Sequence, residues 1–213
     1  PLCRACELEL PSNQHPCQVC ALDLASPDLI CMDCQRQARS FTHCVAPWLY
    51  GKPISTFLKQ FKFTADMHVL PLLSHLLVNA IRQDIETHGA PDLVLPVPIH
   101  WWRLVRRGFN HAELLAKDLS SHPSIHPCQL QVKPSWCKKI RLTAAQHDLG
   151  LAQRKSNLAG VFSCDDRVAG LSVAIVDDVI TTGATAENVS CALLAAGAQQ
   201  VRVWCLARTP NPS

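Results

Sequence analysis

One stretch of this sequence constrains the fold more than any other, because a short apolar run leads directly into two carboxylates, a turn and a helix. Residues 172–176 are apolar and partly β-branched, which is the pattern of a strand buried on both faces of a parallel sheet. Asp177 and Asp178 follow this run. Residues 184–196 then have helical spacing, and Gly197 marks the end of the helix. Ligands of parallel sheets bind at the carboxyl ends of strands, so we expect a binding site at this turn.

The turn between the strand and the helix has a composition that suits a phosphate group. It consists of Thr181, Thr182, Gly183, Ala184 and Thr185. Backbone N–H groups at a helix start are unpaired and point outward, where the helix dipole favours an anion. Gly183 permits close approach of the backbone, and the threonine hydroxyls add donors. The segment therefore predicts a sugar-phosphate site.

The acidic pair, Asp177 and Asp178, needs a different partner. Like charges repel, so the two carboxylates suit the hydroxyls of a ribose, or a magnesium ion shared with a second phosphate group. The alternative is a buried strand followed by a helix capped by threonine, with both aspartates as ordinary loop charges. The chain contains no Walker-type Gly-x-x-x-x-Gly-Lys-Ser/Thr and no Gly-x-Gly-x-x-Gly, so the usual triphosphate and dinucleotide motifs are absent.

Further strands and helices alternate along the rest of the chain. Apolar runs at 44–50, 92–97 and 201–206 are typical of strands, and 70–85 and 110–121 have the spacing of helices. This alternation predicts an α/β fold with a mostly parallel sheet flanked by helices. With 213 residues and 48% hydrophobic content, the chain can bury a full domain core and carry a small appendage.

The positive charge is concentrated in the middle third of the chain. The whole sequence carries a formal charge of +3, but residues 98–158 hold ten Lys and Arg against three acidic residues, a net charge of +7. A polyanionic partner such as single-stranded DNA would meet the protein there; the alternative is a solvated basic face. The longest apolar stretch, 68–81, is interrupted by polar residues and a proline, and no secretory signal is visible. We therefore expect a cytoplasmic protein without membrane insertion.

Six of the twelve cysteines form three Cys-x-x-Cys pairs near the start of the sequence. The pairs are Cys3 with Cys6, Cys17 with Cys20, and Cys31 with Cys34, and ten residues separate each pair from the next. Two such pairs make one tetrahedral thiolate site that suits zinc. The second and third pairs form the most compact set and are expected to hold a structural Zn²⁺, whereas the first could pair with a further knuckle upstream. A redox pair is the alternative. We expect a zinc-ribbon appendage at 1–43 and the α/β domain at 44–213.

The acidic pair and the turn closely resemble the phosphoribosyl pyrophosphate (PRPP) signature of the type I phosphoribosyltransferases. Nearly the whole chain resembles the ComF family of phosphoribosyltransferase-like proteins, including the GntX-type members associated with DNA uptake and use. The shared motifs are the Cys-x-x-Cys pairs, Phe61-Lys62-Phe63, Pro96-Val-Pro98, Arg106-Arg-Gly-Phe-Asn110, Thr143, Gln146, Arg154, Asn157-Leu158 and Asp177-Asp-Val-Ile-Thr-Thr-Gly-Ala-Thr185. Family members commonly differ by an earlier fourth Cys-x-x-Cys, a Gln at the position of His111, and a Pro near Ala144 or Ala145.

The resemblance implies that PRPP binds with Mg²⁺, that Asp177 and Asp178 contact the ribose hydroxyls, and that the threonine-rich turn binds the 5-phosphate. Transfer of ribose 5-phosphate from PRPP requires neutralisation of the leaving pyrophosphate. Suitable cations in the basic segment are Arg106, Arg107, Lys139 and Arg141. Lys62 reaches the site by analogy with the family or is an ordinary helix-end lysine.

Two functions remain open at this stage. The first is a phosphoribosyltransferase that transfers ribose 5-phosphate to an unidentified nitrogenous acceptor. The second is a non-catalytic, PRPP-sensing protein of DNA uptake that binds single-stranded DNA and works with a helicase. Both use the same acidic pair and turn, so the sequence does not separate them.

Overall fold

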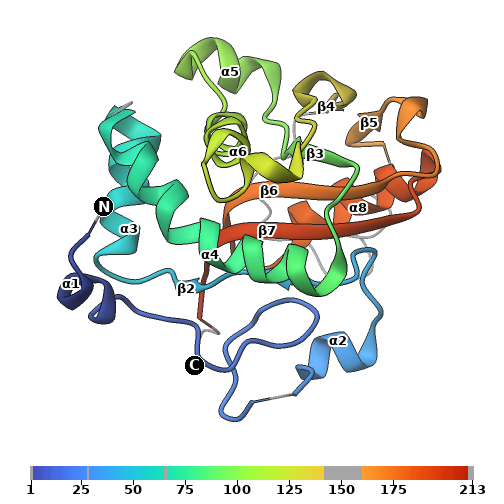
Figure 1. The fold of residues 1–213 in the computed structure, drawn as a ribbon. Helices are drawn as coiled ribbons and strands as arrows, with labels where there is room; N and C mark the ends of the chain where they lie inside the picture. Colours follow the sequence, from blue (N-terminus) through green and yellow to red (C-terminus); the bar gives the residue numbers. More distant parts are fainter. Residues whose placement is uncertain (1, 28, 65–66, 142–159, 211–213) are drawn as a thin grey trace.

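The structure, a computed structural model, describes residues 2–27, 29–64, 67–141 and 160–210 (Figure 1). Some of the family motif residues lie outside this range. They are Thr143, Gln146, Arg154, Asn157 and Leu158, together with Ala144 and Ala145. None of the helices in the described part of the chain has the length and apolar character needed to span a bilayer.

A parallel five-stranded sheet forms the centre of the fold (Figure 1). Its strands are β1 (Cys44–Val45), β2 (Trp48–Leu49), β3 (Leu93–Pro96), β6 (Ser172–Ile180) and β7 (Gln200–Arg208). The strand order is β1-β7-β6-β3, and β2 also pairs with β7. Every pairing in this sheet is parallel. The predicted α/β fold with a mostly parallel sheet is confirmed.

Helices cover both faces of this sheet, with α3 (Ile54–Lys59), α4 (Leu70–His88) and α6 (His111–Ser121) on one face and α8 (Ala184–Ala195) on the other. Three shorter helices lie outside these layers, namely α1 (Arg4–Leu8), α2 (Met32–Arg36) and α5 (Trp101–Arg107) (Figure 1). A π-helical turn spans Gln60–Thr64, and 3-10 turns span Met67–Val69, His126–Cys128, Pro134–Trp136 and Asp166–Val168. A small antiparallel hairpin pairs β4 (Cys137–Lys139) with β5 (Phe162–Cys164).

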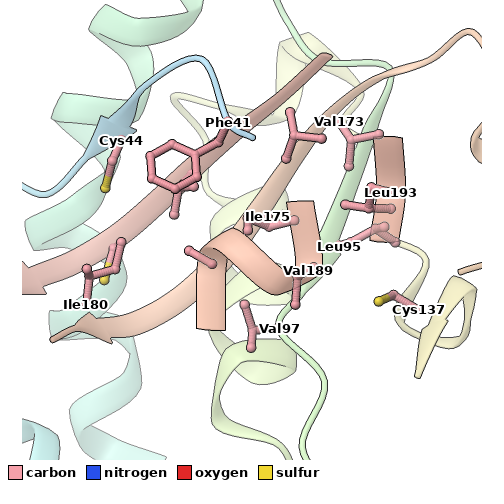
Figure 2. Close-up of a cluster of buried hydrophobic side chains, with 14 of the residues drawn as sticks. Phe41, Cys44, Leu95, Val97, Cys137, Val173, Ile175, Ile180, Val189 and Leu193 are labelled. Atoms are coloured by element: carbon pink, nitrogen blue, oxygen red, sulfur yellow. The ribbon is translucent and has the colours of Figure 1, made fainter. Parts of the chain in front are cut away.

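The alternation of side chains along β6 divides the core into two clusters. Val173 and Ile175 pack with residues of α8 and of the cysteine-rich segment, as Figure 2 shows for part of this cluster. Ala174 and Val176 face the other side, where α3, α4 and α6 cover the sheet. Both faces of β6 are therefore buried, which explains why its sequence is an uninterrupted apolar run.

The structure differs from the sequence analysis at one predicted strand and adds one helix. The run 44–50 forms two short strands rather than one, because Pro47 between them has no N–H to donate to a ladder. Residues 101–107 form a helix that the sequence pattern did not indicate. This helix, α5, begins after His100, whose Nδ1 accepts a hydrogen bond from the Trp102 N–H at 3.3 Å, and it ends at Gly108 in the left-handed conformation.

Candidate functional site

The acidic pair lies inside strand β6 rather than beyond its end. Strand β7 continues to pair with this part of β6, with Asp177 opposite Cys205 and Val179 opposite Ala207. The expected strand end at residue 176 was therefore wrong, because the long partner strand extends the ladder through the two charges. Asp178 is buried and Asp177 is partly exposed. Both line one polar cavity of about 180 Å³, beside the residues that follow β3.

Lys62 supplies a cation to the acidic pair. Its Nζ lies 2.5 Å from Oδ2 of Asp178, and its side chain also lines the polar cavity. The lysine stands in the π-helical turn Gln60–Thr64, directly after α3. Only 9% of the Asp178 side chain is exposed, so removal of the lysine would leave a buried, uncompensated carboxylate. The structure thus places at the acidic pair a lysine whose position the sequence left open.

The carboxyl group of Asp177 is hard to ionise. Loss of solvation raises its pKa, the negative charge of Asp178 raises it further, and the positive charge of Lys62 offsets only part of this, so the pKa reaches about 8. Such shifts are concentrated at functional sites, although structural networks also produce them. A ligand that needs both carboxylates ionised must therefore bind against this raised pKa.

The threonine-rich turn leads into the start of α8 with the geometry expected for an anion site. Gly183 is buried and has a φ of 79°, in the left-handed region that favours glycine. Thr182 Oγ1 accepts a hydrogen bond from the Ala184 N–H at 3.3 Å. Thr181, Thr182, Ala184 and Thr185 are exposed, and Thr185 lines the polar cavity. The first N–H groups of a helix have no partner within the helix, so they can bind a phosphate here.

Only some of the predicted cations lie at the cavity. Arg107, in the last turn of α5, and Lys139, at the end of β4, line it together with Lys62. Arg106 and Arg141 are exposed and are not among the lining residues. Neighbouring residues on a helix point about 100° apart, so Arg106 and Arg107 cannot both face the cavity.

A larger apolar cavity adjoins the polar one. It has a volume of about 450 Å³ and includes Trp101, Leu104 and Ile140 in its lining. The two cavities share Pro98, Ile99, Asn110 and Lys139. A pocket of this size with a few polar groups among its lining residues fits a largely apolar ligand group next to the acidic pair.

Asn110 and His111 are site residues that the sequence did not identify as such. Asn110 Oδ1 accepts from the Ala112 N–H at 3.1 Å, and its Nδ2 donates to the Val97 carbonyl at 3.1 Å. This N-cap fixes the start of α6 beside the end of β3. His111 Nε2 lies 3.2 Å from the Lys62 carbonyl oxygen, and burial lowers the pKa of this imidazole. The Arg-Arg-Gly-Phe-Asn motif was the only signal in the sequence for this part of the site.

The second and third Cys-x-x-Cys pairs form one buried cluster that could hold zinc. The Sγ atoms of Cys17, Cys20, Cys31 and Cys34 all lie within 4.8 Å of one another. Cys20 and Cys31 are 3.6 Å apart at sulfur, and the Cys31 N–H donates to Cys17 Sγ at 3.2 Å. Four thiols at this spacing fit a tetrahedral thiolate site. Cys3 and Cys6 are exposed in the α1 segment and are not part of the cluster.

Two sets of hydrogen bonds tie this cysteine cluster to the turn. Arg208 is buried at the end of β7, where its Nε donates to the Cys20 carbonyl at 3.2 Å and its Nη1 donates to the carbonyls of Ile180 and Thr181. Ser40, which follows the cysteine-rich segment, donates from N and Oγ to the carboxylate of Glu187 in the first turn of α8. The cluster and the turn are therefore held as one unit.

Comparison with known proteins identifies relatives over almost the whole chain. The sequence is 33% identical to DNA utilization protein YhgH of Salmonella typhimurium over 98% of this chain and 90% of the relative. It is 32% identical to Competence protein F of Haemophilus influenzae, over 97% of this chain and 90% of that protein. The chain belongs to the ComF family. A more distant member, Competence protein ComFC of Bacillus subtilis, is 26% identical over 92% of this chain and 79% of its own length. No family model matches the sequence.

Solved structures similar to this ComF-family protein are phosphoribosyltransferases. Glutamine PRPP amidotransferase from B. subtilis aligns with 63% of this chain and 25% of its own, with a TM-score of 0.40 and 20% identity. A Trypanosoma cruzi hypoxanthine phosphoribosyl transferase aligns with 67% of this chain and 74% of its own, with a TM-score of 0.40 and 13% identity. These similarities are too distant to transfer a function.

Proposed function

We propose that this protein binds PRPP together with Mg²⁺ between β6 and α8, and transfers its ribose 5-phosphate to a nitrogenous acceptor. The observation that carries the proposal is that one polar cavity combines both aspartates, Thr185 at the start of α8, and the cations Lys62, Arg107 and Lys139. An anion-binding turn beside paired carboxylates suits a ligand that carries both phosphate and vicinal hydroxyls. PRPP has both groups.

The 5-phosphate of PRPP lies at the turn in this proposal, and the ribose lies over the acidic pair. The backbone N–H groups of residues 183 and 185 donate to the phosphate oxygens, and the threonine hydroxyls add further donors. Asp177 and Asp178 accept hydrogen bonds from the two ribose hydroxyls, which fixes the sugar ring with C1 toward the middle of the cavity. Charge-assisted hydrogen bonds of this kind contribute about 1.5 to 3 kcal/mol each.

The pyrophosphate faces Arg107 and Lys139 at the other side of the cavity. As the bond from ribose C1 to the pyrophosphate oxygen breaks, negative charge moves onto the leaving group, and these fixed cations stabilise it. Mg²⁺ bound to the pyrophosphate would supply further neutralisation of this charge. An acceptor nitrogen in the adjoining apolar cavity then forms a bond to C1, and the proton that this nitrogen loses passes to the released pyrophosphate or to solvent.

The cysteine cluster holds one structural Zn²⁺ in the same proposal. A cysteine-rich segment this short has little core of its own, so four thiolate bonds to zinc would supply most of the stability of its fold. Because Arg208 connects the Cys20 carbonyl to the turn, zinc binding would also stabilise the conformation of the phosphate-binding turn.

Pyrophosphate release tests the transferase. Zinc-loaded protein is incubated with PRPP, Mg²⁺ and a panel of nucleobases, nucleosides and oligonucleotides, and we expect release that depends on one class of acceptor. The Asp177→Asn, Asp178→Asn double variant serves as the control and should release none above background. Absence of release with every acceptor would contradict catalysis, and PRPP binding measured in the same samples would then favour the second function.

The second function is a non-catalytic one, in which PRPP binding regulates contact with single-stranded DNA. The observation that favours it is α5, which exposes Trp101 and Trp102 with relative exposures of 62% and 53%, beside the exposed Arg106. Exposed aromatic side chains next to cations are typical of surfaces on which bases stack. Relatives named for DNA utilization and competence are consistent with it.

Oligonucleotide binding tests this second function. Fluorescence anisotropy should show affinity that falls steeply with salt, and the Lys138→Ala, Lys139→Ala, Arg141→Ala variant should have a shallower salt dependence. Trp102→Ala should weaken binding at every salt concentration, because stacking does not depend on counterion release. Binding that is absent at low salt, or insensitive to salt, would contradict the DNA-binding function.

A further inference from the structure

A second group of metal-ligand side chains lies at the opposite end of the sheet from the polar cavity. It consists of His43, just before β1, and of Asp84 and His88 in the last turns of α4. Their ligand atoms all lie within 4.8 Å of one another. The main chain of His43 accepts a hydrogen bond from the N–H of Val203, near the amino end of β7. The acidic pair, by contrast, stands near the carboxyl ends of the strands.

One oxygen of Asp84 faces both histidines. His43 Nε2 lies 2.5 Å from Asp84 Oδ1, and His88 Nδ1 lies 3.0 Å from the same oxygen. Asp84 and His88 are four residues apart on α4, so they project from the same face of the helix. The two imidazole rings stack with centroids 4.4 Å apart. Two ring nitrogens therefore lie around one carboxylate oxygen, within 4.8 Å of each other.

The residues around this group hold the three ligands in place. Trp204 Nε1 donates to Asp84 Oδ2 at 2.7 Å, and Arg202 Nη1 donates to the same oxygen at 3.2 Å. These bonds occupy Oδ2 and leave Oδ1 to the histidines. Thr42 Oγ1 lies 3.1 Å from His43 Nδ1, a contact that helps to orient the ring whose Nε2 faces the carboxylate. Outer hydrogen bonds to ligating histidines and carboxylates are the usual support of a metal site.

We propose that His43, Asp84 and His88 bind one divalent transition-metal ion of the zinc, cobalt or nickel class. Two imidazoles and a carboxylate are the donor set that these ions prefer, whereas Mg²⁺ and Ca²⁺ prefer oxygen donors. In tetrahedral zinc the ligand atoms are about 3.3 Å apart, so the contacts at Asp84 need to widen by less than about 1 Å. The His88 side chain is 49% exposed, which leaves a path for the ion and a position for water as fourth ligand.

The metal would join elements that are distant in the sequence. It would link the carboxyl end of α4 to the chain that enters β1, directly after the cysteine-rich segment. None of the three residues lines the polar cavity, so the ion is expected to stabilise the fold rather than to contact PRPP. The inference does not depend on the proposed transferase activity.

Metal titration tests the proposal. Full-length protein is first loaded with one equivalent of Zn²⁺, which the four thiols take because thiolates bind zinc more tightly than imidazole and carboxylate. Calorimetric titration with further Zn²⁺ should then show a second site of 1:1 stoichiometry. His88→Gln should weaken this second site by at least about tenfold, as should His43→Gln. His126→Gln replaces an exposed histidine outside the group and should leave the zinc affinity of the second site unchanged.

Cobalt spectroscopy separates the two sites. Co²⁺ added to the zinc-loaded protein should give d–d absorption without the sulfur-to-cobalt charge-transfer band of a thiolate site, and the melting temperature should rise in wild type but not in His88→Gln. The proposal is overturned if no second equivalent binds. It is equally overturned if the second equivalent binds to His88→Gln as tightly as to wild type, or if the cobalt spectrum shows a thiolate band.

Discussion

Replacement of Arg208 by Met should destabilise the protein strongly and loosen the phosphate turn. Arg208 is 6% exposed, and its Nε and Nη1 carry three hydrogens for the carbonyls of Cys20, Ile180 and Thr181. Hydrogen bonds from a charged donor contribute about 1.5 to 3 kcal/mol each, and their loss leaves buried carbonyls unpaired. Water will replace part of the lost hydrogen bonding, so we expect the free energy of unfolding to fall by about 3 to 5 kcal/mol. Methionine keeps the length and apolar body of the side chain, so little of the loss is packing.

Urea denaturation of the zinc-loaded protein measures this change, and PRPP titration of the folded variant measures the effect on the turn. Arg208→Lys, which keeps the charge but not the forked geometry, should lie between wild type and Arg208→Met in both measurements. Arg167→Met is the matched control, because Arg167 pairs with Asp165 and stacks over the Trp136 ring on the surface, so its loss should lower the free energy of unfolding by about 1 kcal/mol at most. An Arg208→Met protein as stable as wild type would refute the connection between the cysteine cluster and the turn.

Other changes test single groups of the site. Burial and the charge of Asp178 raise the pKa of Asp177 to about 8, and the ionised carboxylate is the stronger acceptor for a ribose hydroxyl, so PRPP affinity should rise with pH up to about pH 8 and then level off; Asp177→Asn should flatten this profile in calorimetric titrations. Gly183→Ala places a Cβ where the phosphate approaches and should weaken PRPP binding at least about tenfold. Gly170→Ala carries the same backbone strain at a φ of 76°, away from the turn, and should leave PRPP affinity unchanged. Cys17→Ser should abolish stoichiometric zinc in elemental analysis whereas Cys3→Ser should not, and the reverse order would assign the metal to the first pair.

Local patterns in the sequence were sufficient for the sheet, its main helices and the cysteine cluster. The apolar run of β6, the helix that follows Gly183, and the regular Cys-x-x-Cys spacing each depend on residues close together in the chain. Such features follow from backbone periodicity and ligand spacing. The expected set Cys17, Cys20, Cys31 and Cys34 comes together in the structure for this reason.

Contacts between distant elements could not be predicted in the same way. Lys62 meets Asp178 across more than one hundred residues of sequence, and Arg208 reaches back from the last strand to Cys20. The sequence around Lys62 is also typical of an ordinary helix end, and the sequence around Arg208 is typical of an ordinary strand end. The length of β6 depends on its pairing with β7. Arg107 rather than Arg106 lines the polar cavity because both residues belong to helix α5. These contacts depend on which elements pack against each other in the folded protein.

The central claim, that PRPP binds over the acidic pair at the start of α8, is tested most directly by calorimetric titration of PRPP with Mg²⁺. Zinc-loaded wild type is compared with the Asp177→Asn, Asp178→Asn variant, after circular dichroism shows that both are folded. The substitutions leave Lys62 unpaired and make the cavity more positive, so attraction of phosphate alone would tighten binding. We predict instead a loss of at least about tenfold, or about 1.4 kcal/mol, because neutral amide groups replace the charged carboxylate acceptors of the ribose hydroxyls. Equal or tighter binding by the variant would contradict the account.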